Sequence, residues 1–213
     1  MPHPQVAPVR PAHDAPDTRE RLLDAAERLF AERGFEGASM RALTQAAGTS
    51  LSAANYHFGS KETLLEATLV RRLAPLNQQR LEALLALGPA PMLEDILDGY
   101  LRPLFEARLR TPGAAPVRTS LAARLYADPS EAVARLKREL QAEVNARFLE
   151  AFQRALPDRD PTALAVSQQL IIGMVVHVMS GHVEAAPFSS LLDPLIAHAA
   201  AGLRGTPLAA GAR

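Results

Sequence analysis

Hydrophobic residues recur every three or four positions along most of the chain, which is the period of amphipathic α-helices. The first such stripe predicts a helix over 18–33. Asp17, with Glu20 three positions later, predicts a capping box at its start. Gly34 predicts a left-handed turn at its end, and we expect Phe35 to pack beneath that turn. The apolar stripe comprises Leu22, Leu23, Ala26, Leu29 and Phe30.

Two much shorter helical segments follow, and a glycine closes each of them. One begins after Ser39 and ends before Gly48, and the other begins after Thr49 or Ser50 and is broken by Gly59. The second short helix has an apolar inner side and a small, polar and aromatic outer side. This is the construction of a helix-turn-helix, which lays one helix into a DNA groove. The inner side is Leu51, Ala54 and Phe58, and the outer side is Ser52, Ala53, Asn55, Tyr56 and His57.

A long helix is predicted from Lys61, after the cap Ser60, to about Leu87. Pro75 lies inside it, and an interior proline removes one backbone hydrogen bond and kinks the helix at a cost of about 3 kcal/mol. We interpret Pro75 as a kink that lets the helix curve over its neighbours, the alternative being a hinge between two functional parts. The buried face of this helix is Leu64, Leu65, Thr68, Leu69, Leu76 and Leu84.

The rest of the chain also has helical periodicity, so we predict an all-α protein of about nine helices. A strong start signal is formed by Asp128 as N-cap, Pro129 as first helical residue and Glu131 in the first turn. Asp160 followed by proline is a second such signal. The predicted helices are 92–109, 116–126, 129–156, 162–183 and 190–203.

The helix over 162–183 is apolar on nearly every side between Leu170 and Met179. A helix that is apolar all round is buried all round. In a chain of this size one side can contact the core and another side a second subunit. The helix over 190–203 offers a matching apolar face, and two such helices from each of two chains make a four-helix interface with two-fold symmetry. We therefore expect a homodimer.

Composition and length agree with this organisation. Hydrophobic residues make up 48% of the chain and aromatic residues 5%, which favours helix over sheet. The 213 residues suffice for one mid-sized domain or two small ones. We predict a flexible, proline-rich arm over 1–16, a helix-turn-helix DNA-binding domain over 17–62, a helical effector-binding and dimerisation domain over 63–205, and a tail over 206–213.

The net charge is an objection to DNA binding, because DNA-binding domains usually carry a basic surface. The chain has 23 basic and 23 acidic residues, and residues 1–72 hold nine of each. The distribution answers part of the objection. Between Gly37 and Thr63 the charged residues are Arg41, Lys61 and Glu62, so the predicted DNA-facing surface has few carboxylates to repel phosphates.

Several chemistries find no support in the sequence. There is no cysteine for a disulfide, a thiolate metal site or a thiol nucleophile. We find no glycine-rich phosphate loop or nucleophile elbow, and His177 and His182 are separated by roughly 140° around a helix. We therefore predict no catalytic residue, no metal and no cofactor. The N-terminus has no signal-peptide core, and the longest apolar run is shorter than the roughly 20 residues of a membrane helix, so we expect a soluble, cytoplasmic protein.

The stretch from Thr18 to Leu65 resembles the DNA-binding domain of the TetR family of transcriptional repressors. The resemblance is carried by RLLDAAERLFAERGFEGAS, MRALTQAAGTS and NYHFGSKETLL. It covers about a quarter of the chain, and a three-helix unit that leads into a long fourth helix is much more specific than a lone helix-turn-helix. The positions that fit are Phe30, Gly34, Phe35, Ser39, Ala46, Gly48, Ser50, Tyr56, Phe58, Lys61 and Leu64.

The resemblance implies a homodimer that binds a palindromic operator, usually as a repressor, and leaves the DNA when a small molecule binds its C-terminal domain. The last two helices form the dimer interface in this family, which agrees with the apolar helices described above. The C-terminal part is most similar to the PsrA-type regulators, some of which respond to fatty acids or their thioesters, on the segments NYHFGSK and PLNQQRLEAL. A small hydrophobic or acyl effector is therefore an expectation.

The residue types suggest specific DNA contacts. Ser50, Ser52 and Ala53 are small, which lets the backbone of the second short helix approach the groove closely. Lys61 lies in the first turn of the long helix, where free backbone N–H groups already favour a phosphate. By resemblance, Arg41 matches a position that reaches a base edge or a phosphate.

Four further positions complete the predicted DNA site. By resemblance, Tyr56 and His57 match positions that contact the sugar-phosphate backbone, and both side chains can donate a hydrogen bond to phosphate. The sequence departs from the family at Asn55 and Leu51, where many members have tyrosine and a polar residue. Asn55 can still bond a phosphate or an adenine edge. Leu51 either contacts a thymine methyl group or packs inside.

The effector site is harder to define from sequence. An acyl ligand needs an apolar tube with one cation near its mouth. Candidate lining residues are Tyr100, Arg108, Arg124 and His177, although a buried, hydrogen-bonded histidine is the common alternative for His177. Two alternative functions remain open: a helical interaction protein without DNA binding, and an enzyme that processes a small molecule. Activator and repressor are not separated by sequence.

Overall fold

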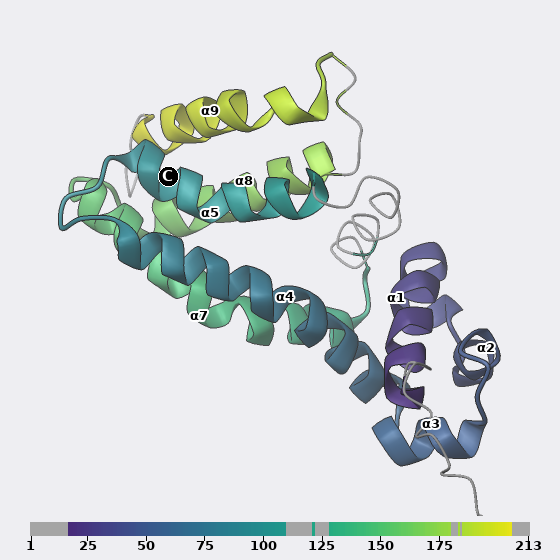
Figure 1. Cartoon of the computed structure of the whole chain (residues 1–213). Helices are drawn as coiled ribbons and strands as arrows, with labels where there is room; N and C mark the ends of the chain where they lie inside the picture. Colours follow the sequence, from purple (N-terminus) through teal and green to yellow (C-terminus); the bar gives the residue numbers. More distant parts are fainter. Residues whose placement is uncertain (1–16, 110–120, 122–127, 180–182, 184, 206–213) are drawn as a thin grey trace, which may run out of the picture.

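The computed structural model describes residues 17–109, 121, 128–179, 183 and 185–205. These residues form helices and no strand, so the predicted all-α class is confirmed. The predicted arm, the tail and most of the predicted helix over 116–126 lie outside them, although Leu121 is helical and buried. The helices in Figure 1 are α1 (Thr18–Gly37), α2 (Met40–Ala46), α3 (Leu51–Phe58), α4 (Lys61–Ala86), α5 (Leu93–Leu109), α7 (Glu131–Ala155), α8 (Pro161–Met179), the 3-10 helix η1 (Phe188–Ser190) and α9 (Leu192–Arg204).

Most helix ends follow the predicted signals. The hydroxyl oxygens of Ser39, Ser50 and Ser60 accept hydrogen bonds from the backbone N–H three residues later, at 3.2, 3.1 and 3.1 Å. These serines therefore satisfy backbone donors that would otherwise lack a partner at the starts of α2, α3 and α4. Asp160 does the same for α8, accepting from Ala163 at 3.0 Å. The helix α4 continues through Pro75 to Ala86.

Two predicted caps and one helix end are wrong. Asp17 makes no side-chain cap, and the carboxylate of Glu20, its expected partner, instead accepts from the arginines Arg19 and Arg71. Asp128 is not the N-cap of α7, which begins at Glu131. Its carboxylate instead accepts from two backbone N–H groups, one of them in α1. The helix α8 ends at Met179, and Val183, the predicted end, is not helical.

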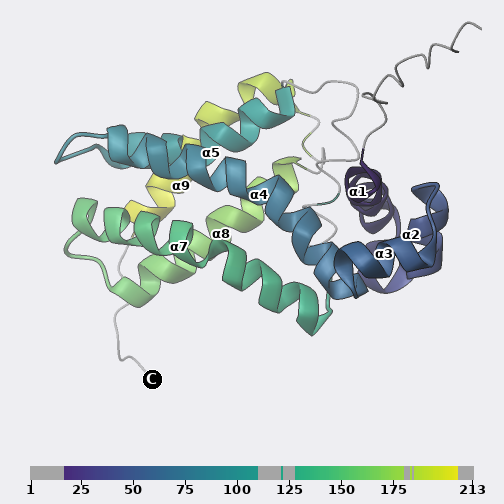
Figure 2. The same ribbon diagram turned by 60° about the horizontal axis from the view of Figure 1, so that its bottom comes forward.

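The buried hydrophobic residues form two separate clusters. The head core lies among α1, α2, α3 and the first half of α4, and Leu121 and the first turns of α7 also belong to it. The bundle core lies among α5, the second half of α7, α8 and α9. Figures 1 and 2 show α1–α3 at one end of the molecule and α5, α8 and α9 at the other. Only α4 and α7 among the described helices contribute to both ends, and they pack against each other.

The apolar helix α8 packs against α7 and α9. Gln168 is buried in it and donates to the carbonyl oxygen of Asn145 on α7 at 3.0 Å. The other side of α8 is uncovered in the single chain, since Leu170 is 65% exposed. By length and composition α8 is the one helix of the described residues that could cross a membrane, with a mean hydropathy of 1.6. Its contacts with α7 and α9 cover part of that apolar surface, and the side that carries Leu170 lies outside these contacts.

Candidate nucleic-acid interface

The short helix α3 is fixed on the head by its inner side. Ala54 is fully buried in the head core, and Phe58 is nearly so. Gly48 (φ 60°) forms the turn between α2 and α3, and Gly59 (φ 73°) ends α3. Positive φ values of this kind favour glycine, because other residues clash with their own backbone there. The two glycines therefore let α3 lie across the head beside α1 and α2 (Figure 2).

The outer side of α3 is accessible. Ser52, Asn55 and Tyr56 are exposed, with Tyr56 at 86%, while Ala53 and His57 are half-buried. The rings of Tyr56 and His57 contact each other edge to face, with centroids 5.3 Å apart. No acidic residue occurs in α2 or α3. The exposed outer side of α3 thus carries no carboxylate.

The structure decides between the two alternatives for Leu51. Its side chain is 50% exposed, so it lies on the outer surface, and its assignment to the inner side with Ala54 and Phe58 is wrong. Ser50 serves as the cap of α3, and Arg41 is exposed at the start of α2. The roles of these residues toward DNA remain predictions.

Lys61 occupies a different position from the one expected of a phosphate ligand. Its ammonium nitrogen donates to the carbonyl oxygen of Phe35 at 3.1 Å and lies 4.1 Å from the centroid of the Phe35 ring. The carboxylate of Glu36 is a further 4.0 Å contact. Lys61 therefore joins the start of α4 to the end of α1, and its side chain is engaged within the protein.

Sequence reasoning missed two arginines near α3. The guanidinium of Arg19 lies 5.7 Å from the centroid of the Phe58 ring, at the end of α3. Arg21 donates to the carbonyl oxygen of Gly48, in the turn before α3, at 3.4 Å. Both belong to the first turn of α1, which packs against α3. The residue pattern of α1 does not indicate this contact. Only the predicted packing of the three helices could have suggested it.

Three acidic residues of the head are gathered around one arginine. Arg71 of α4 contacts the carboxylates of Glu20, Asp24 and Glu27, at 3.1, 2.9 and 3.1 Å. Burial lowers the pKa of Arg71, but the hydrogen bonds that it donates to Asp24 and Glu20, with the charges of Asp24 and Glu27, outweigh burial and leave that pKa raised. Three of the nine acidic residues in the first 72 thus share one guanidinium along the contact between α1 and α4, which compensates part of their charge.

The three predicted effector residues that the structure describes lie at different places in the bundle. Tyr100 is buried in the bundle core, and its hydroxyl donates to Asn145 at 2.7 Å. Arg108 donates to the carbonyl oxygen of Met179 and stacks on the ring of Phe188. His177 lies on the exposed side of α8. Arg124 lies outside the described residues.

A buried arginine beside Tyr100 was also missed. Arg80 is 5% exposed, donates to the backbone oxygen of Tyr100 at 2.8 Å and lies 4.7 Å from that ring's centroid. Burial lowers its pKa. A signal was available, because Arg80 falls four residues from both Leu76 and Leu84 on the stripe assigned to the buried face of α4.

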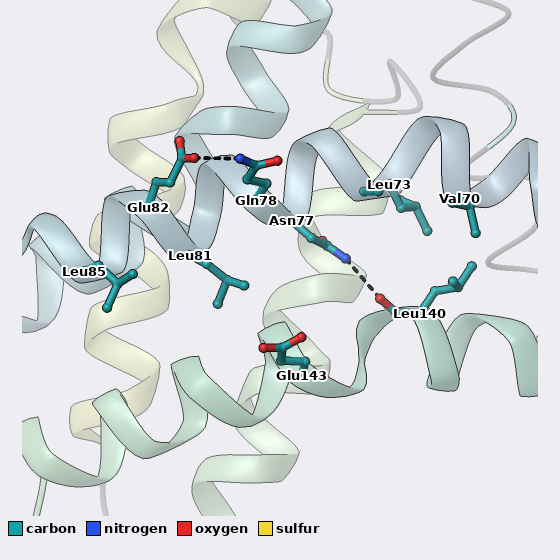
Figure 3. A pocket seen from close by; sticks show the side chains of 10 residues that line it. Val70, Leu73, Asn77, Gln78, Leu81, Glu82, Leu85, Leu140 and Glu143 are labelled. Carbon is teal, nitrogen blue, oxygen red and sulfur yellow. Dashed lines mark hydrogen bonds between the residues drawn. The ribbon is translucent and has the colours of Figure 1, made fainter.

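Two surface grooves occur in the described part of the bundle. One, of about 350 Å³, lies between α4 and α7 (Figure 3). Across it, the side-chain amide of Asn77 donates to the carbonyl oxygen of Leu140 at 3.0 Å. The other groove, of about 480 Å³, lies between α8 and α9. The first is lined by Val70, Leu73, Ala74, Asn77, Gln78, Leu81, Glu82, Leu85, Leu140 and Glu143, and the second by Gly173, Met174, His177, Val178, Leu191, Pro194, Leu195 and His198.

Comparison with known proteins finds a family model for each end of the molecule. Residues 22–68 match the model for bacterial regulatory proteins of the tetR family, and residues 98–202 match the model for the tetracyclin repressor-like C-terminal domain. The transcriptional repressor AcnR of Corynebacterium glutamicum is 47% identical over 57 residues, which are 26% of this chain. The regulator UidR of Escherichia coli is 40% identical over 58 residues, or 27% of this chain. Each match spans 30% of the relative's own length.

Solved structures share the whole fold at low sequence identity. The fatty acid degradation regulator FadR of Bacillus halodurans aligns with a TM-score of 0.67 at 16% identity, over 91% of this chain and 99% of that one. AibR, solved with isovaleryl coenzyme A and operator DNA, aligns with a TM-score of 0.65 at 19% identity, over 85% and 97%. The two family models together match more than half of the sequence, and the chain belongs to the TetR family of bacterial regulatory proteins.

Proposed function

We propose that the protein is a DNA-binding transcriptional repressor that reads a palindromic operator through the outer side of α3. The observation that carries this proposal is the exposed, carboxylate-free surface of α3, held on a closed core by Ala54 and Phe58. The similarity to AcnR, which is named a repressor, supports it for the head, which is the part of the chain that matches. Direct base contacts come from Ser52, Asn55 and Leu51, and Arg19, Arg41 and Tyr56 bind the backbone of the DNA. Such a protein acts in the cytoplasm.

The same proposal includes a homodimer formed by α8 and α9. Two large apolar residues of α8, Leu170 and Val166, are 65% and 49% exposed. The helix contains no charged residue that would favour contact of this side with water. The apolar groove between α8 and α9 continues this surface. A second copy would cover both, and two-fold symmetry would present α3 twice, as a palindrome requires.

We further propose that a small apolar ligand regulates DNA binding from the bundle. The groove between α4 and α7 supports this, because it is lined mainly by Val70, leucines and Ala74, and because these two helices join the bundle to the head. AibR binds an acyl thioester. For this chain an acyl portion fits the apolar lining, whereas Glu82 and Glu143 disfavour an anionic group at the same place.

The direct test is selection of DNA by the purified full-length protein from a random pool of duplexes. We expect enrichment of a palindrome whose half-sites lie about one helical turn apart. The matched variant Tyr56→Ala, which alters only an exposed ring, should weaken binding to the selected duplex without changing the helix content or the oligomeric state. Absence of an enriched palindrome would contradict the proposal and favour an interaction protein. Reporter transcription from the selected duplex then separates a repressor from an activator.

A further inference from the structure

Near the end of α1, the backbone N–H of Phe35 lies just after a break in the helix. Gly34 has φ 73° and ψ 178°, which interrupts the helix just before Phe35. The ring of Phe35 is buried against Phe30, with centroids 6.0 Å apart, so this interruption lies inside the head rather than at its surface. A buried N–H group outside a helix needs an acceptor from elsewhere in the chain.

Two distant segments bind the backbone of Phe35, one at its N–H and one at its carbonyl oxygen, which also accepts from the N–H of Ala38. The carboxylate of Asp128 accepts from the N–H of Phe35 at 3.2 Å, across 93 residues of sequence. The ammonium group of Lys61 donates to the carbonyl oxygen of the same residue at 3.1 Å and packs on its ring. We call these three residues the Phe35 joint. The second oxygen of Asp128 accepts from the N–H of Ser130 at 2.9 Å, which fixes the carboxylate against the start of α7.

The joint lies where the bundle meets the head. The first turns of α7 place Val133 and Leu136 in the head core, and its later residues Val144, Phe148 and Phe152 belong to the bundle core. The 25 residues of α7 extend over about 37 Å as one helix. Lys61 is the first residue of α4, the other helix that reaches both cores. The joint therefore ties α1 to the beginnings of both connecting helices.

We propose that Asp128 is a positioning residue that sets the orientation of the head on the bundle, and that Lys61 serves the same joint rather than a DNA phosphate. The proposal rests on the proposed function as an operator-binding dimer. Two heads that are each held at a fixed angle can accept only a narrow range of half-site spacings. A loosened joint widens that range, whereas loss of a direct DNA contact lowers affinity at every spacing alike.

The test uses the full-length protein and the duplex that wild-type protein enriches from a random pool. Asp128→Ala should raise the hydrogen-exchange rate of the peptide covering residues 31–38 by about tenfold. Discrimination between the selected spacing and spacings one or two base pairs longer or shorter should fall by about tenfold. The matched control is Asp160→Ala, which removes a capping carboxylate of α8 far from the head and should change neither measurement.

A second variant separates positioning from phosphate binding. Lys61→Met keeps most of the apolar stem and removes the charge, so it should widen the accepted spacings and leave the salt dependence of binding unchanged. A phosphate ligand would instead reduce the logarithmic salt slope by about one. If Asp128→Ala fails to fold, Asp128→Asn, which retains one acceptor oxygen, should give intermediate exchange and intermediate discrimination.

The outcomes are separable. Unchanged exchange and unchanged spacing discrimination in Asp128→Ala would overturn the inference. So would a uniform loss of affinity at all spacings, or a lower salt slope for Lys61→Met. If the wild-type protein selects no palindrome, the proposed function fails. Hydrogen exchange then decides the joint by itself, because faster exchange in Asp128→Ala supports it and unchanged exchange refutes it.

Discussion

The head and the bundle differ in how completely a single chain buries their apolar side chains. In α1–α3, all of which are described, the large hydrophobic residues are covered except for Leu51 and Tyr56, and both of these belong to the proposed DNA surface. The bundle leaves Val166 and Leu170 of α8 exposed together with an apolar groove. The head is thus complete within one chain, whereas the bundle presents a surface that suits a second copy.

The largest expected effect sharpens this comparison at the head. Ser52→Trp places a bulky ring on the outer side of α3, where it prevents close approach to the groove and should weaken operator binding by about 100-fold or more. Fluorescence anisotropy with the selected duplex measures the loss. Because Ser52 is exposed, the dimer and the melting temperature should be unchanged. The exposed residue Gln79 of α4 offers the control Gln79→Trp. A dissociated or unfolded Ser52→Trp protein would mean that the outer side of α3 is structural.

An effect of similar size is expected at the bundle, on the stability of the dimer. Leu170→Glu places a carboxylate in the proposed interface, where its desolvation should weaken the dimer by about 100-fold. Analytical ultracentrifugation measures the dissociation constant, and operator affinity should fall with it. Leu85 is even more exposed, at 84%, but lies on α4, so Leu85→Glu is the matched control. Equal dimer stability in the two variants would place the interface elsewhere.

A smaller effect distinguishes the ion pairs of the two regions. Arg71→Met leaves three carboxylates of α1 without their shared partner, and Glu27 among them is only 12% exposed. We expect a loss of about 1–3 kcal/mol in the free energy of unfolding, measured with urea at pH 7. In the bundle, Arg102 pairs with Asp98 on the surface of one helix. Arg102→Met should cost less than about 0.5 kcal/mol. A similar cost for both would show that the network on α1 contributes no more than a surface pair.

The comparison also explains what the sequence could predict. Helix periods, serine caps and the glycines Gly34, Gly48 and Gly59 are local signals, and α2, α3 and α4 begin where those signals place them. The exposed side of α3 was predictable for the same reason, except at Leu51, which the apolar pattern placed on the inner side. Contacts between distant segments were not predictable, because the side chains that make them also have a plausible local role. The local sequence predicts that Asp128 caps a helix and that Glu20 completes a capping box, but each carboxylate bonds a residue of another helix. Lys61 had the appearance of a phosphate ligand, and its partner Phe35 is 26 residues away.

The smallest effect compares two glycines that have the same free space and different backbone conformations. A Cβ atom added at Gly59 or at Gly202 meets no atom within 4 Å, so neither substitution by alanine is hindered by neighbours. Gly59 has φ 73°, which costs alanine about 1 kcal/mol, so Gly59→Ala should lower the free energy of unfolding by that amount. Gly202 lies within α9, where alanine is favoured over glycine by about 0.8–1 kcal/mol, so Gly202→Ala should raise the free energy of unfolding. Urea unfolding of both variants gives the two signs. A loss at Gly202 would indicate that the partner subunit packs closely on this position, because nothing within the described chain obstructs a methyl group there.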